Sequence, residues 1–274
     1  MTKIINPAAA RAVAEFDDTS SGIYKGVFVA NDISYHGVLT VNFGNDSQYN
    51  AILEYGDDER IGFIPVNKGS VSVCKVIEFR GRNAGFTLNV SDYNRPVVSD
   101  GYIDGQKAQA KLLKETSTNR VNAALGTFSD DLDPAFNGTW DLLSMTLGVI
   151  TISGFQLPVN IIDEVVIVRS GSAIMFTDNM MENFTPGAAC SILLPTLPSG
   201  PQEPFFTGLI DLLSIVLDEY AVVTQTSTFA EEEATWSLIY SKAAGNKYYD
   251  QDCTETPLGG TWSWKGRSGH ILVN

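Results

Sequence analysis

Residues 96–114 read PVVSDGYIDGQKAQAKLLK, and this stretch decides the fold class. Asp104-Gly105 is typical of the two-residue type I′ turn of a β-hairpin, because both residues tolerate a positive φ. After the turn, apolar and polar residues alternate from 108 to 112, as in a strand with one buried face. The stretch therefore predicts two antiparallel strands, 96–103 and 107–114, joined by a tight turn.

The same pattern repeats towards the N-terminus. Short segments rich in β-branched and aromatic residues, bounded by Gly, Asn or Asp, predict six further strands at 22–29, 36–43, 48–55, 60–66, 71–79 and 85–90. Eight strands joined by tight turns indicate an up-and-down antiparallel sheet. Two arrangements stay open, a closed and calycin-like barrel or an open sheet curled over an N-terminal helix. The alanine-rich residues 7–16 predict that helix.

Charge and tryptophan content both change near residue 129. Residues 1–128 carry 13 Lys+Arg and 14 Asp+Glu, whereas residues 129–274 carry 5 and 18. All the tryptophans lie in the second part, at Trp140, Trp236, Trp262 and Trp264. We therefore expect an all-β protein of two antiparallel units. They are a barrel-like domain with an N-terminal helix over 1–128 and an acidic, Trp-containing β domain over 129–274.

The second part has less regular spacing. Strands are expected at 150–155, 163–169, 172–177, 220–229, 234–240 and 270–273, with an exposed acidic turn at 231–233. The nearly continuous apolar residues 205–219 fit a buried helix or a long strand, and we favour the helix. The segment 129–134, SDDLDP, predicts a solvated acidic turn. Its three aspartates also suggest a calcium site, but the spacing of an EF-hand loop is missing.

A tripeptide motif occurs twice, as Gly138-Thr139-Trp140 and Gly260-Thr261-Trp262. The first copy resembles the G-x-W near the first strand of lipocalin-like and avidin-like barrels, in which the Trp closes one barrel end. The resemblance covers these residues alone. It implies a barrel with the indole ring at one end.

Most catalytic classes lack their residues in this sequence. Only two histidines occur, His36 and His270, and there is no G-x-S-x-G, G-x-G-x-x-G, Walker or H-E-x-x-H motif. No zinc-type cysteine spacing occurs, so we expect no metal and no cofactor. Cys74 is expected to be a buried thiol, and whether Cys190 and Cys253 form a disulfide stays open.

Two acidic side chains suffice for glycoside hydrolysis, so that activity remains an alternative. The carboxylates embedded in apolar sequence are Asp141, Asp163, Glu164 and Glu219. A second alternative is a structural, self-assembling surface component.

The main functional hypothesis is non-enzymatic binding of a glycan or a small apolar ligand. The aromatic residues expected to form that site are Trp140, Trp262, Trp264 and Tyr240. The net charge of −14 argues against nucleic acid as a partner, and no segment is apolar enough to predict a membrane span. We expect an extracellular or cell-surface location, although residues 1–7 lack the apolar region of a secretory signal.

Overall fold

The structure is a computed structural model, and it describes residues 11–66, 75–152, 155–171 and 175–179, followed by strand segments at 184–185, 220–229, 232–241, 248–249, 255–256, 259–264 and 266–273. Side chains are described over 11–66, 75–145, 164–171, 259–264 and 266–273. The chain forms two compact units, Met1–Thr127 with Phe136–Met181, and Phe128–Ala135 with Glu182–Asn274. Whether residues 1–128 and 129–274 are separate domains stays a prediction.

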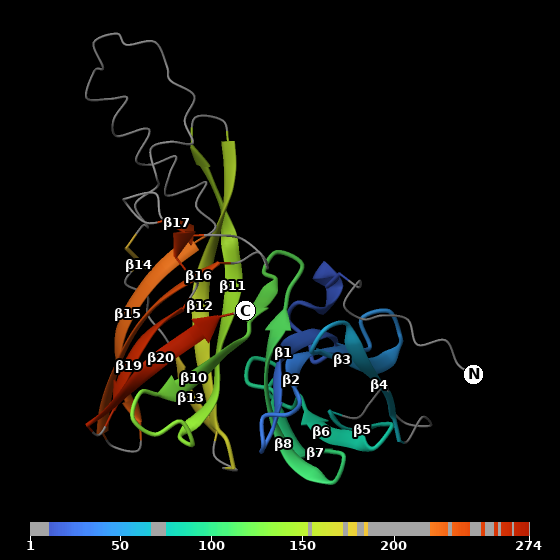
Figure 1. Cartoon of the computed structure of the whole chain (residues 1–274). Helices are drawn as coiled ribbons and strands as arrows, with labels where there is room; N and C mark the ends of the chain where they lie inside the picture. The colour runs from blue at the N-terminus through green and yellow to red at the C-terminus, as the bar shows by residue number, and fades with distance from the viewer. Residues whose placement is uncertain are drawn as a thin grey trace. The chain divides into compact units, whose positions relative to one another are not determined.

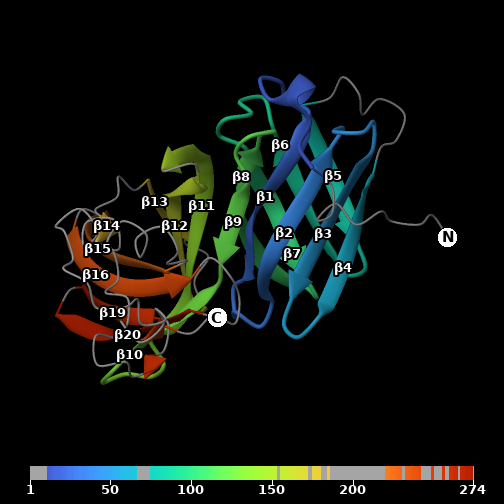
Figure 2. The ribbon, with the colours of Figure 1, turned by 90° about the horizontal axis from the view of Figure 1, so that it is seen from above.

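The first unit contains a closed antiparallel barrel of eight strands, which confirms the barrel-like all-β fold (Figures 1 and 2). The strands are β1 (Gly22–Ala30), β2 (His36–Phe43), β3 (Tyr49–Tyr55), β4 (Glu59–Pro65), β5 (Val76–Gly81), β6 (Ala84–Asn89), β7 (Val97–Ile103) and β8 (Gln106–Glu115). Neighbours in sequence are neighbours in the barrel, and β1 pairs with β8 to close it. The predicted turn is also present, because Asp104 and Gly105 have φ of 46° and 81° and Ile103 pairs with Gln106.

Side chains fill the barrel interior. The largest fully buried rings are those of Tyr24, Phe28, Phe63, Phe79 and Phe86. Phe86 stacks on Phe79 and meets the edge of Phe63, with centroid distances of 5.2 Å in both pairs. These rings and the aliphatic residues around them form one core cluster, so the barrel axis is a packed interior.

A second sheet of the same unit covers part of the outer face of the barrel. It consists of β9 (Val121–Ala124), β11 (Asn137–Ile152), β12 (Phe155–Arg169) and β13 (Met175–Asn179), with β11 between β9 and β12. Val27 of β1 and Leu113 of β8 point outward and pack against Val121, Leu143 and Val166 of this sheet. That apolar contact places polar residues of β11 and β12 against the barrel surface.

The second unit is also a β-sheet. Its strands run in the order β10 (Gly126–Asp130, from Phe128 on in this unit), β20 (Arg267–Val273), β19 (Gly259–Trp264), β16 (Glu232–Ser241), β15 (Tyr220–Phe229) and β14 (Phe184–Thr185). A separate ribbon pairs β17 (Tyr248–Tyr249) with β18 (Glu255–Thr256).

The expected N-terminal helix over 7–16 is wrong in its described part. Residues 11–13 are not helical, and only Ala14–Phe16 form a 3₁₀ turn. Asn45 explains the difference, because its side chain accepts the Val13 N–H at 3.1 Å and donates to the Arg11 carbonyl at 2.9 Å. The barrel therefore holds this backbone in place of helical hydrogen bonds. Residues 7–10 lie outside the described residues.

Two boundaries in the second part are also corrected. Glu232 and Glu233 belong to β16, where they pair with Phe229 and Thr228, so the expected acidic turn at 231–233 is largely strand. The expected strand at 150–155 is the end of β11 and the beginning of β12. The predicted helix over 205–219 and all three cysteines lie outside the described residues.

Candidate functional site: a pocket beside β8

A bulge in β7 shapes the barrel wall next to the pocket. The pairing of β6 with β7 shifts between Gly85 and Thr87, where Asp100 and Gly101 of β7 lie opposite the single residue Phe86 of β6. Asp100 has a φ of 53°, an uncommon value for a residue other than glycine. A bulge bends its strand. Beyond the bulge, β7 keeps its register with β6 as far as Val97.

The loop before β7 is fixed by its own polar side chains. The Asp92 side chain accepts the Asn94 N–H at 3.1 Å, and its carbonyl accepts the Arg95 N–H at 3.2 Å. Pro96 is buried and follows directly, which favours an extended backbone at Arg95. The loop therefore presents Asn94 and Arg95 from a defined turn.

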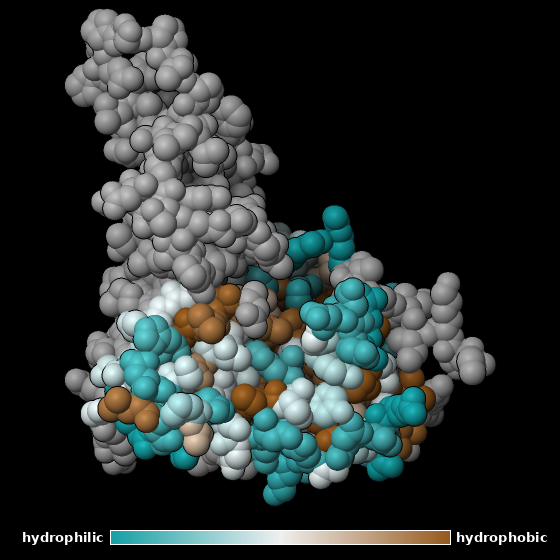
Figure 3. Space-filling view, in the orientation of Figure 1, coloured by the Kyte–Doolittle hydropathy of each residue, from teal (hydrophilic) through white to brown (hydrophobic). Residues whose placement is uncertain are grey.

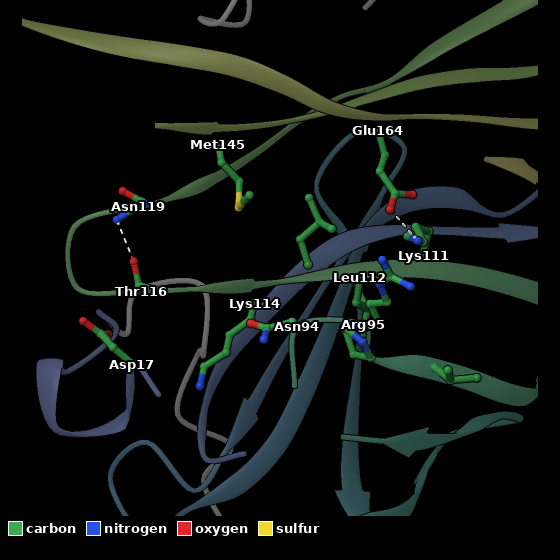
Figure 4. Close-up of a pocket in the computed structure, with 13 residues that line it drawn as sticks. Asp17, Asn94, Arg95, Lys111, Leu112, Lys114, Thr116, Asn119, Met145 and Glu164 are labelled. Atoms are coloured by element: carbon green, nitrogen blue, oxygen red, sulfur yellow. Dashed lines mark hydrogen bonds and ion pairs between the residues drawn. The ribbon is translucent and has the colours of Figure 1, made fainter. Parts of the chain in front are cut away.

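A pocket of about 810 Å³ lies where this loop meets β8 (Figure 4). Its walls come from the loop, from β8 and from the β11–β12 hairpin, all within the first unit. Val97, Leu113 and Met145 supply apolar surface, and Val97 is 57% exposed. The volume falls in the range of small-molecule sites, about 300–1,000 Å³.

Most charged groups around the pocket already have partners within the protein. Lys111 Nζ lies 2.6 Å from Glu164 Oε1. Lys114 Nζ donates to the carbonyl oxygens of Phe16, at 2.7 Å, and Thr19. Burial lowers the pKa of Lys114, although nearby aspartates oppose the shift. The Asp17 carboxylate accepts hydrogen bonds from Ser117 through both oxygens.

Arg95 differs from these residues. It is exposed, it lines the pocket, and its guanidinium has no ion-pair or hydrogen-bond partner among the residues that the structure describes. A guanidinium binds carboxylates through paired hydrogen bonds. Among the described residues, the pocket therefore combines an apolar wall with a cation, Arg95, that has no partner there and can bind an anion.

The aromatic residues predicted to bind ligand lie elsewhere. Trp140 lies in β11 of the first unit and is 4% exposed, and Trp262 lies in β19 of the second unit and is 5% exposed. The Trp262 indole donates to the Ser129 carbonyl at 3.2 Å and meets Phe128 edge-on. Buried rings offer little surface for stacking against a sugar.

The other two predicted ligand residues lie in the same sheet of the second unit. Trp264 follows on the same face of β19 and is partly buried. Tyr240 lies in β16 opposite Ala221, and its side chain is outside the described ones. A ligand site at the four aromatic residues stays a prediction.

Two of the embedded carboxylates contact basic side chains. His36 Nε2 lies 2.6 Å from Asp141 Oδ1, and the same oxygen accepts the Gly126 N–H at 3.1 Å. Asp141 is completely buried, and its Oδ2 has no hydrogen-bond partner within the described residues. Glu164 pairs with Lys111, as described above. Glu219 and the side chain of Asp163 lie outside the described residues, so glycoside hydrolysis stays a hypothesis.

The acidic segment at 129–134 is tied to β20 within the second unit. Asp130 accepts the N–H groups of Leu132 and Asp133 and the Arg267 guanidinium. Burial alone would raise the pKa of Asp130, but these hydrogen bonds outweigh it and the pKa is lowered. His270 Nδ1 lies 2.6 Å from Asp131 Oδ1. The described part of the chain holds no group of three or more potential metal ligands.

Comparison with known proteins finds no family model that matches the sequence, and no similar curated protein or solved structure. Gly138-Thr139-Trp140 lies in β11, which is not a strand of the closed barrel. Among the described residues, no helix is long and apolar enough to cross a membrane. On the face in Figure 3, hydrophobic groups of the described residues lie as separate patches between polar ones.

The sequence contains no signal that singles out this pocket. Arg95, Met145 and Glu164 are far apart along the chain and meet only through the packing of the hairpin on the barrel. The Asx-type pattern around Asp92 predicts a turn, but not that the turn faces β8.

Proposed function

We propose that this protein is a non-enzymatic binding protein and that the pocket beside β8 is its ligand site. The ligand has an apolar part that contacts Leu113, Val97 and Met145, and a carboxylate that binds Arg95. The single observation that carries the proposal is a guanidinium with no partner among the described residues, next to an apolar wall in a pocket of about 810 Å³.

The other charges around the pocket support this choice of ligand. Lys111, Lys114 and Asp17 are held by intramolecular partners, so binding to them would require breaking existing contacts. The Arg95 guanidinium can donate hydrogen bonds to a ligand without breaking a contact to any other described residue. The proposal includes an exported or cell-surface location, which fits a chain with only 18% charged residues.

Binding is tested with anilinonaphthalene sulfonate, an apolar fluorophore with an anionic group, and with dodecanoate as the competitor. We expect saturable fluorescence that dodecanoate displaces. The Arg95→Ala variant should bind both probes about tenfold more weakly or worse, because a hydrogen bond to a charged group contributes about 1.5–3 kcal/mol.

The matched control is Arg82→Ala. Arg82 is also an exposed arginine of the barrel, in the turn between β5 and β6, and it does not line the pocket. Its replacement should leave both affinities unchanged. If neither probe binds the folded protein, or if both variants bind like the parent chain, the pocket is not the ligand site.

A further inference from the structure

The outer face of the barrel at β4 to β7 concentrates exposed apolar side chains. The covering sheet packs on β1 and β8, and β4 and β5 are farthest from these two strands in the order of the barrel (Figure 2). Among the described residues, eight large hydrophobic side chains are exposed. Five of them lie on or directly beside β4, β5 and β7, namely Ile64, Val66, Val76, Val97 and Tyr102. Single exposed apolar groups are normal, whereas several on one face mark an interaction site.

Strand pairing fixes which side chains are neighbours on this face. Phe79 of β5 and Phe86 of β6 point into the core, so the residues on either side of them in each strand point outward. The pairings of β5 with β4 and β6, and of β6 with β7, arrange these outward residues in two adjacent rows across the strands. One row holds Ile64, Arg80, Gly85 and Tyr102, and the next holds Val66, Glu78, Thr87 and Ser99.

The two rows are complementary to each other in charge and in apolar surface. Glu78 and Arg80 lie in different rows of the same strand, and both side chains are exposed. In a symmetric dimer, a contact from one residue to another occurs twice, once in each direction. A twofold axis that runs across the strands between the rows therefore places Glu78 against the partner's Arg80, and Arg80 against the partner's Glu78. The same axis places Ile64 against the partner's Val66, so apolar surface meets apolar surface.

The distribution of charge allows two copies to meet at this face. Residues 129–274 carry 5 Lys+Arg and 18 Asp+Glu, so two such acidic parts repel each other, whereas residues 1–128 carry 13 and 14 and are nearly neutral. The two rows themselves hold one acid and one base. A patch four strands wide and about 20 Å long covers about 400 Å² per copy. That area is about half of a standard protein interface, so the dimer is expected to be weak.

We propose that this protein forms a weak symmetric homodimer through the outer face of β4 to β7, with Glu78 of each copy against Arg80 of the other. This inference goes beyond the proposed function, because none of the eight residues in the two rows lines the pocket beside β8. Ligand binding and dimerisation can therefore be tested separately. The Arg95→Ala variant, which is expected to lose ligand affinity, should dimerise like the parent chain.

The test is sedimentation equilibrium of the full chain from about 5 to about 500 µM, where a dimer with a dissociation constant of about 10–100 µM is detected. Glu78→Arg and Arg80→Glu each place like charges in both symmetric contacts, so each should weaken the dimer about tenfold or more. The double variant with both substitutions exchanges the two charges and should dimerise like the parent chain. An equimolar mixture of the two single variants should form a heterodimer, because opposite charges meet again.

The matched control is the charge reversal Arg60→Glu. Arg60 is an exposed arginine of β4 that pairs with Glu54 and lies about 13 Å along the strand from Ile64, outside the two rows. Its replacement should leave the dissociation constant unchanged, and circular dichroism checks that every variant is folded. Three results overturn the inference: a monomer at every concentration, a dimer that neither single reversal weakens, or single reversals that neither the double variant nor the mixture restores.

Discussion

The buried pair of His36 and Asp141 gives the sharpest stability prediction. The two residues are 105 positions apart and join β2 of the barrel to β11 of the covering sheet. Asp141 is completely buried and the His36 side chain is only 12% exposed. Replacing either residue by Ala leaves its partner inside the protein without its main contact.

The magnitude follows from the groups left behind. Asp141→Ala leaves two donors without their acceptor, His36 Nε2 and the Gly126 N–H, at about 1–3 kcal/mol each. His36→Ala leaves a buried carboxylate with the Gly126 N–H only, and breaking a buried pair costs about 3–5 kcal/mol. Each single variant should therefore lose about 3 kcal/mol or more of unfolding free energy. The double variant should lose about 2 kcal/mol less than the sum of the two.

The assay is urea unfolding of the four proteins of this double-mutant cycle, followed by circular dichroism. The surface pair Glu78–Arg80 is the control, because its N–O distance is also 2.6 Å while its side chains are 41% and 61% exposed. Its coupling energy should be below about 1 kcal/mol. If the costs of the His36 and Asp141 substitutions simply add, within about 0.5 kcal/mol, the two residues do not depend on each other and the reasoning fails.

Three further predictions concern single positions. Gly26→Ala should destabilise the barrel by about 3 kcal/mol or more in urea unfolding, since an added Cβ would lie 1.9 Å from the Lys111 carbonyl oxygen in the β1–β8 pairing; wild-type stability would contradict this close approach. Burial raises the pKa of Glu115, so the folded state binds this proton more tightly and its ionisation destabilises the protein above that pKa. Glu115→Gln should therefore raise the unfolding free energy at pH 8, and the gain should shrink as the pH falls towards 4; a constant gain across that pH series would be inconsistent. The pKa of Asp130 is lowered, so its stabilising contribution is present above the pKa of the unfolded chain and is lost as the pH falls through the folded pKa. Arg267→Ala should weaken this acid dependence in thermal melts between pH 6 and 2, and an unchanged melting profile would show that the ion pair does not matter.

The barrel could be predicted from the sequence because nearly every strand pairs with the next strand along the chain. Each strand ends in residues that favour a turn, and each turn leads to the neighbouring strand, so the sequence from residue 22 to residue 114 gives the pairing directly. Asp104-Gly105 is the best example, with both residues at positive φ as the dipeptide predicts. Closure was left open by the sequence, because the β1–β8 pairing depends on twist and shear that no local pattern records.

The candidate site could not be predicted because its lining residues come from distant parts of the sequence. The bulge next to the pocket occurs at Asp100, a non-glycine residue with positive φ inside a segment whose sequence predicts a regular strand. Met145 reaches the pocket only because Leu143 packs on the outer face of the barrel. The sequence predicted a ligand site at the tryptophans because they cluster in the acidic second part of the chain. Trp140 and Trp262 proved to be buried, as large apolar rings usually are.

The order of strand pairing also constrains when each unit can form during synthesis. The barrel needs only contacts between sequential hairpins until β8 has emerged, and then β1 can pair with it. By contrast, β10 pairs with β20, so this pairing can form only after residues 267–273 have been synthesised. On a ribosome the syntheses of β10 and β20 are thus separated by several seconds or more, since chains grow at about 5–20 residues per second. During that interval β10 lacks its β20 partner, and pairing with the wrong strand is the main hazard on the way to the native sheet.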